Sequence, residues 1–153
     1  MTPNGLPPDW RSRITPDHVT SLAPDQVFVF GSNLRGIHGA GAARQAWQQF
    51  GAQRGVGEGP TGRCYALPTK RTPWEKMKLW EVEHSVEMFL AYARQCFTYN
   101  PVETFLVVEV GCKLAGFTPE QIAPLFRPSP NGLPPNLWLP LSFWNVLAEH
   151  GGQ

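Results

Sequence analysis

Short apolar runs alternate with helical patterns along most of this chain. The apolar runs stand at residues 27–30, 64–67, 105–110 and 137–139, with the sequences VFVF, CYAL, FLVVEV and LWL. Short continuous apolar runs are typical of strands that are buried on both faces of a sheet. We therefore predict a strand at each of these four positions.

Helical patterns separate the predicted strands. Apolar residues recur at steps of three and four over residues 40–50 and again over residues 79–97. A shorter helix is expected to begin near Pro119, with Thr118 as its N-cap, and to end before Pro128. The resulting alternation of strand and helix predicts an α/β sandwich around a largely parallel central sheet.

The length of 153 residues fits one domain, which at this size folds without a metal or disulfide staple. Residues 1–24 contain five prolines and predict an extended arm or wrapping segment, and residues 25–153 form the predicted domain.

Charge and cysteine content narrow the function classes. Lys and Arg number 13 against 12 Asp and Glu, a net charge of +1, so direct binding to nucleic acid or to an anionic membrane is not expected. The three cysteines show neither a disulfide framework nor a metal-ligand spacing, so we expect a reduced, cytoplasmic protein without a metal site. The sequence contains neither a membrane-length apolar stretch nor the apolar core of a signal peptide.

Polar or glycine-rich segments follow the first three predicted strands. They are GSNLRGIHGAGAA, PTKR and GCKLAG. If the strands are parallel, these segments meet at one edge of the sheet, where open α/β folds bind ligands. We therefore predict a ligand site at that edge.

The first segment has features of a phosphate-binding loop. Gly36, Gly39 and Gly41 permit close approach of the backbone, and the helix that starts near Ala40 offers unpaired N–H groups. The spacing matches neither a P-loop nor a dinucleotide-binding fingerprint. An ordinary glycine-rich turn between strand and helix is the alternative.

Individual side chains in these segments each have two interpretations. Asn33 suits a pair of ribose hydroxyls or a local turn. His38 suits a phosphate contact or proton donor, or is an ordinary loop histidine. Lys70 suits a phosphate contact or a nucleophile, or is a surface lysine. In the third segment Lys113 lies between two glycines, and Cys112 is not expected to be a nucleophile, because no partner base is evident.

Taken together, these segments make residues 14–140 resemble a macrodomain, the ADP-ribose-binding α/β/α module. The GSN and HGAGAARQAWQQFG sequences are similar to the macrodomain pattern of an Asn after a strand, a glycine-rich loop and a helix that ends in Phe-Gly. YALPTKR and VEVGCKLAG are similar to the strand ends of the subclass that removes ADP-ribose from acidic side chains. The resemblance implies a three-layer α/β/α sandwich with a mixed, largely parallel sheet.

The resemblance also implies roles for single residues. Asp17 would accept a hydrogen bond from the adenine amine, Asn33 would contact the distal ribose, and Lys70 would attack the anomeric carbon. The implied ligand-binding residues are Asp17, Ser32, Asn33, Gly36, Gly39, Ala40, Gly41, Gly111, Cys112, Lys113, Leu114, Ala115 and Gly116.

The chain departs from that subclass at one working position. Ala115 stands where the subclass has an Asp, so hydrolysis would need another base, such as His38 or Glu58. Lys113 replaces a glycine and adds a positive charge beside the expected diphosphate. The resemblance thus implies binding of ADP-ribose, of a related NAD-derived nucleotide or of an ADP-ribosylated macromolecule, without a cofactor. It leaves hydrolysis of an ADP-ribosyl bond open.

Two alternatives to hydrolysis remain from the sequence. One is a non-catalytic reader or sequestering module for the same nucleotide, which Ala115 favours. The other is a partner-binding domain with a degenerate pocket, which Trp74, Trp80 and Trp144 favour because they fall in no predicted core position.

Overall fold

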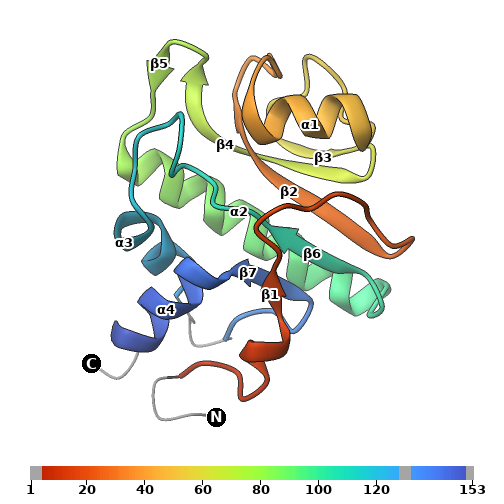
Figure 1. The fold of residues 1–153 in the computed structure, drawn as a ribbon, viewed down its shortest axis with the longest axis vertical. Coiled ribbons are helices and arrows are strands. Elements are labelled where there is room, and N and C mark those ends of the chain that lie inside the picture. Colours follow the sequence, from red (N-terminus) through yellow and green to blue (C-terminus); the bar gives the residue numbers. More distant parts are fainter. Residues whose placement is uncertain (1–4, 128–131, 151–153) are drawn as a thin grey trace.

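A computed structural model describes residues 5–127 and 132–150 of the chain (Figure 1). Three segments lie outside the described residues. They are residues 1–4 and 151–153, at the outer ends of the two predicted regions, and residues 128–131. In chain order the elements are η1 (Trp10–Ser12), β1 (Ile14–Thr15), β2 (Gln26–Asn33), α1 (Gly41–Gln49), β3 (Gly59–Thr61), β4 (Cys64–Thr72), β5 (Glu75–Lys76), α2 (Leu79–Tyr99), β6 (Thr104–Val107), α3 (Pro119–Ile122), η2 (Ala123–Phe126), β7 (Leu137–Pro140) and α4 (Leu141–His150).

The strands form one mixed sheet in the order β1-β7-β6-β2-β4-β3. The pairs β1–β7, β7–β6, β6–β2 and β2–β4 are parallel, whereas β3 and β5 pair with β4 antiparallel. This confirms the predicted mixed, largely parallel sheet.

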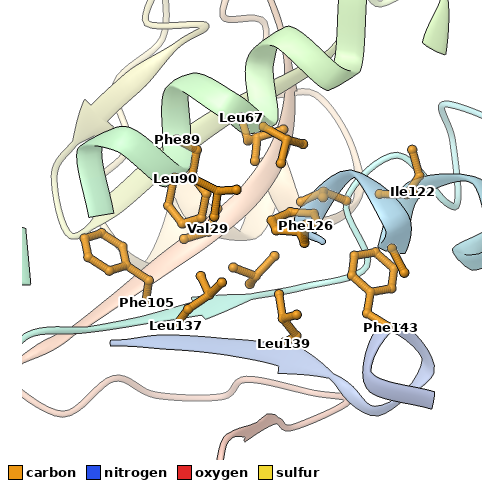
Figure 2. Close-up of a cluster of buried hydrophobic side chains, with 14 of the residues drawn as sticks. Val29, Leu67, Phe89, Leu90, Phe105, Ile122, Phe126, Leu137, Leu139 and Phe143 are labelled. Atoms are coloured by element: carbon orange, nitrogen blue, oxygen red, sulfur yellow. The ribbon is translucent and has the colours of Figure 1, made fainter. Parts of the chain in front are cut away.

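Helices cover both faces of the sheet, which gives the three layers expected. Along β2, Phe28 and Phe30 point to the face that is covered by α1, whereas Val29 points to the opposite face. On that second face, Phe105 and Leu137 from the strands pack with side chains from α2, η2 and α4 (Figure 2). The apolar runs are continuous because their strands are buried on both faces.

The predicted elements are found, with one correction. β2, β4, β6 and β7 contain the predicted strands, and α1, α2 and α3 the predicted helices. Thr118 caps α3, since its hydroxyl accepts a hydrogen bond from the backbone N–H of Gln121. The third strand ends at Val107 rather than at residue 110. There the chain leaves the sheet in a tight turn, in which the N–H of Val110 donates to the carbonyl of Val108.

The segment before β2 packs closely on the rest of the fold. Leu6 and Trp10 belong to the larger buried cluster, and Ile14–Thr15 form β1 at the edge of the sheet (Figure 1). Arg13 is buried, and its Nε donates to the carbonyl of Leu137 at 3.0 Å. Neither β1 nor α4 was predicted from the sequence.

The tryptophans without a predicted position divide into two kinds. Trp144 is fully buried on α4, and its indole N–H donates to the carbonyl of Arg13 at 2.8 Å, so it is a core residue. Trp74 and Trp80 are exposed, at 81% and 67% of their surface. None of the helices in the described part of the chain is long and apolar enough to span a membrane.

Candidate functional site

A cavity of about 860 Å³ opens at the carboxyl ends of the parallel strands. Its walls come from residues 16–20 after β1, from the end of β2 and the start of α1, from the end of β4, from residues 108–111 and 113–115 after β6, and from Pro140 of β7. The volume lies within the range of about 300–1,000 Å³ that is usual for small-molecule sites.

The cavity is long in the direction that crosses the strands. From β1 to β4 the sheet order passes through β7, β6 and β2. Four inter-strand spacings of about 4.8 Å span roughly 19 Å. A ligand that reached both ends would have to be elongated.

Most of the residues predicted to bind a ligand line this cavity. They are Asp17, Ser32, Asn33, Gly39, Ala40, Gly41, Gly111, Lys113, Leu114 and Ala115, together with Lys70. Four predicted residues do not line it: Gly36, His38, Cys112 and Gly116.

The loop between β2 and α1 is organised by the side-chain amide of Asn33. Its Nδ2 donates to the carbonyl of Ile37 at 2.8 Å, and its Oδ1 accepts from the N–H groups of Arg35 and Ile37 at 3.1 and 3.2 Å. This is the local turn interaction that the sequence left as an alternative. The carboxamide oxygen is fully used by the loop, so only the second Nδ2 hydrogen is left for a ligand.

Gly36 makes the close packing of this loop possible. Its φ is +68°, and a Cβ atom there would lie 2.4 Å from the carbonyl carbon of Gly55. A second loop, at residues 53–57, therefore packs against the first. The hydroxyl of Ser32 donates a hydrogen bond to the carbonyl of Gly57 in this second loop.

His38 is turned into the protein and away from the cavity. Its side chain is 1% exposed, lies edge-on to Phe30 with ring centroids 5.3 Å apart, and forms a hydrogen bond between Nε2 and the carbonyl of Gln53 at 3.0 Å. These contacts give it a packing role in the loop.

The start of α1 presents backbone N–H groups at the cavity. Ala40 is the N-cap and offers no side-chain cap, and Gly41, Ala42 and Ala43 line the cavity. The first N–H groups of a helix lack partners within the helix, and they lie at the positive end of its dipole. An anionic group is stabilised at such a position.

Residues 111–115 form a second set of donors. In the described part of the chain, no acceptor is found for the N–H groups of Gly111, Lys113, Leu114 and Ala115. The side chain of Leu114 reaches to within 3.7 Å of the Cβ position of Gly41, so this loop faces the start of α1. Lys113 adds a cation to the same loop and lines the cavity.

The floor between these donors is narrow. A Cβ at Gly31 would lie 3.4 Å from Oγ1 of Thr69 and 3.5 Å from the backbone nitrogen of Gly111. Gly31 thus keeps the ends of β2 and β4 close to the loop after β6.

Lys70 lies at the β4 end of the cavity, in register with Asn33 on β2. It is half-buried, and its Nζ donates to the carbonyl of Pro73 at 2.8 Å. This contact holds the ammonium group beside the turn between β4 and β5.

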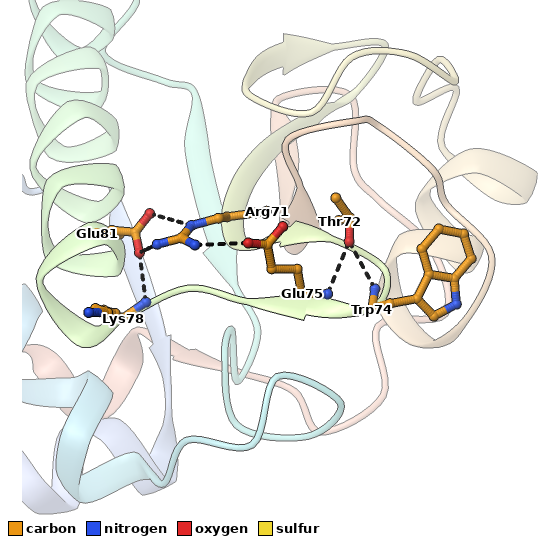
Figure 3. A network of polar contacts seen from close by, with 6 residues as sticks. All are labelled: Arg71, Thr72, Trp74, Glu75, Lys78 and Glu81. Atoms are coloured by element: carbon orange, nitrogen blue, oxygen red, sulfur yellow. Dashed lines mark hydrogen bonds and ion pairs between the residues drawn. The ribbon is translucent and has the colours of Figure 1, made fainter.

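The hairpin that carries Lys70 is fixed to α2 by the ion pair of Arg71 with Glu81, and a second ion pair, of Arg71 with Glu75, lies within the hairpin (Figure 3). Arg71 donates to both carboxylate oxygens of Glu81, at 3.0 and 2.6 Å, and to Glu75 at 2.9 Å. Glu81 also accepts from the backbone N–H of Lys78 at the start of α2. The pKa of Glu81 is lowered, chiefly by its hydrogen bonds with Arg71.

Cys112 has the properties of an inert thiol. Burial raises its pKa to about 12, and the charges of Glu109 and Glu120 act in the same direction. Its Sγ lies 3.5 Å from the carbonyl of Val110. A thiol with this pKa is protonated at neutral pH and is a poor nucleophile.

The sequence interpretation missed Glu109. Glu109 is half-buried and is one of the residues that line the cavity, and its carboxylate accepts a hydrogen bond from the hydroxyl of Ser142 on α4 at 2.7 Å. Its signal was a charged residue within the apolar run FLVVEV, since charged residues are rarely placed among buried positions without a partner or a function.

No group of three or more His, Cys, Asp or Glu residues is placed to hold a metal ion within residues 5–127 and 132–150. Comparison of the chain with models of protein families, with curated proteins and with solved structures finds no match.

Proposed function

We propose that the cavity binds ADP-ribose or a related NAD-derived nucleotide. The observation that carries the proposal is the placement of two sets of unpaired backbone N–H groups on facing walls of one elongated cavity. One set is at the start of α1 and the other at residues 111–115. Such a pair of walls suits a diphosphate, because each offers several donors and α1 adds its dipole.

The two ends of the cavity suit the two ends of such a nucleotide. Asp17, after β1, can accept a hydrogen bond from an exocyclic amine of adenine. Lys70 and Asn33, on β4 and β2, lie at the other end, where the distal ribose would be. The resemblance to macrodomains assigns the same order of groups.

Binding without turnover is the mode that the cavity favours. Ala115 lines it with a methyl group where the acidic-side-chain subclass has an Asp. Among the described residues the carboxylates that line the cavity are Asp17 and Glu109, from the segments after β1 and β6. Asp17 follows β1, which lies four strand spacings, about 19 Å, from the strand that carries Lys70. Glu109 is bound by the hydroxyl of Ser142 on α4. Neither carboxylate therefore stands at the position of the Asp.

The candidate bases named from the sequence do not supply the missing group either. His38 is buried against Phe30, and Glu58 is exposed and does not line the cavity. A reader or sequestering module is therefore the form of the proposal that we put forward.

Calorimetric titration with free ADP-ribose tests binding. Ala42→Asp places a carboxylate in the first turn of α1, where it is compatible with the helix dipole but repels a diphosphate. Ala42→Asn is the matched control of nearly the same shape. We expect the aspartate variant to lose at least about tenfold in affinity and the asparagine variant to lose little. Absence of binding to the unaltered protein, or equal binding by both variants, would contradict the proposal.

A single-turnover assay with protein that carries ADP-ribose on glutamate separates the reader from a hydrolase. A reader retains the modified protein and releases no free ADP-ribose. Release that disappears on Lys70→Ala would instead show a hydrolase that works without an Asp at position 115.

A further inference from the structure

Glu109 is the cavity residue for which the proposed diphosphate site provides no role. A carboxylate close to a diphosphate is unfavourable, yet Glu109 is one of the residues that line the cavity. One of its oxygens, Oε2, accepts from the hydroxyl of Ser142 at 2.7 Å. Its other oxygen, Oε1, has no partner in the part of the chain that the structure describes. The carboxylate is thus held by α4 and retains an open acceptor.

The sheet order places Glu109 between the two regions assigned above. Asp17 follows β1 at one edge, and α1, which offers donors for the diphosphate, follows β2. Between β1 and β2 lie β7 and β6, and Glu109 follows the end of β6 by two residues. Its side chain is bound to Ser142 on α4, which follows β7 on the β1 side of β6, whereas the donors later in the same loop face the start of α1. In a nucleotide, the group between the base and the diphosphate is a ribose. In a nucleotide bound in this orientation, the ribose hydroxyls would be the groups nearest to Glu109.

An ionised carboxylate can only accept hydrogen bonds. It suits ribose hydroxyls, as do the acidic residues that bind the 2′-hydroxyl in dinucleotide sites, whereas a 2′-phosphate is accommodated there by arginine. A phosphate at this position would meet the negative charge of Glu109, with no donor from that side chain. Among the lysines that line the cavity, Lys113 belongs to the loop that faces the start of α1, where the diphosphate is proposed to bind.

We propose that Glu109, held by Ser142, is a specificity-determining residue that selects nucleotides with a free adenosine 2′-hydroxyl over those that carry a 2′-phosphate. The ligand class is then derived from NAD rather than from NADP. This inference rests on the proposed function, because it assumes that the adenosine lies at the β1 end of the cavity.

The test is a titration of the full chain with two probes, ADP-ribose and 2′-phospho-ADP-ribose. The unaltered protein should prefer ADP-ribose by at least about tenfold, because one hydroxyl that donates to a carboxylate is replaced by a repelled phosphate. Glu109→Gln removes the charge and keeps the shape, so it should reduce this preference about tenfold. Ser142→Ala frees the carboxylate and should reduce it less.

Glu120→Gln is the matched control. Glu120 is an exposed carboxylate on α3 that does not line the cavity, so its loss changes the net charge equally but should leave the preference unchanged. Equal affinity of the unaltered protein for both probes would overturn the inference while leaving the proposed function intact. The inference also fails, with the proposed function again intact, if Glu109→Gln and Glu120→Gln change the preference to the same extent.

Binding of neither probe would overturn the proposed function, and this inference with it. If Glu109→Gln does not fold, as judged by its thermal unfolding, the comparison of the two probes on the unaltered protein and on Ser142→Ala still decides the inference.

Discussion

Replacement of Gly36 by alanine tests how the loop between β2 and α1 is supported. At a φ of +68°, an alanine lowers the free energy of unfolding by about 1–2 kcal/mol relative to glycine. The new Cβ would also lie 2.4–2.7 Å from backbone atoms of Gly55 and Val56, and backbone atoms cannot move aside as a flexible side chain can. Overpacking of this kind adds about 1–3 kcal/mol. We therefore expect the free energy of unfolding to fall by about 2–5 kcal/mol.

Two other glycines in these loops separate the two contributions. Gly55 has a φ of +92° with nothing within 4 Å of its Cβ position, so Gly55→Ala should lose only the conformational part. Gly39 has neither a positive φ nor a neighbour within 4 Å, so Gly39→Ala should stay within about 0.5 kcal/mol of the unaltered protein or gain slightly.

Urea unfolding of the three variants gives these differences directly. For a domain of this size, each kcal/mol corresponds to about 2–4 °C in the unfolding midpoint, so Gly36→Ala should unfold at least about 4 °C lower. If Gly36→Ala proves as stable as Gly39→Ala, the loop does not pack against residues 55 and 56 as described.

Three further predictions concern the cap, the ion pair and the thiol. Thr118→Ala should lower the free energy of unfolding in urea by about 0.5–2 kcal/mol, while Thr118→Ser keeps the cap of α3 and should not. The pKa of Glu81 is lowered by Arg71 in the folded protein, so its stabilising contribution is present above the pKa of the unfolded chain and is lost as the pH falls through the folded value. Stability measured against pH should therefore fall less steeply in acid for Glu81→Gln than for Glu83→Gln, and parallel curves would contradict this. Because the pKa of Cys112 is about 12, its alkylation at pH 8, followed by peptide mass spectrometry, should be at least about 100-fold slower in the folded protein than in urea; equal rates would contradict the burial of this thiol.

Hydrophobic pattern was sufficient to predict the inner strands and the longer helices. Phe28, Val29 and Phe30 are adjacent and all buried, because β2 is covered on both faces, so a continuous apolar run was a direct signal of this strand. The Thr118 cap was also predictable, because it depends on side chains within one turn of the helix.

Elements that depend on distant contacts gave weaker signals. Ile14–Thr15 is a strand only because β7 lies beside it, and two residues are too few to show a period. The orientation of His38 depends on Phe30 and on the carbonyl of Gln53, so the loop sequence could not show that its ring turns inward.

The same difference between local patterns and contacts of distant residues applies to the candidate site. The position of the cavity could be predicted, since three polar segments follow parallel strands and their ends meet at one edge. The role of Asn33 in the turn could be named only as an alternative, because a carboxamide serves a loop and a ribose equally well. Glu109 carried only the signal of a charged residue in an apolar run, and its contact with Ser142 could not be predicted, because α4 was not predicted.

The pairing of β1 with β7 has a consequence for how the chain acquires its cavity. Ile14 pairs with Leu139, and the contact of Arg13 with Leu137 joins residues that are 124 positions apart. Contacts at such separation form slowly, because a long stretch of chain must be ordered before they are made. The wall that contains Asp17 is anchored through this strand. A polypeptide still on the ribosome, or one cleaved before residue 137, would therefore lack the β1 side of the cavity, so we expect ligand binding to begin only after synthesis has passed β7.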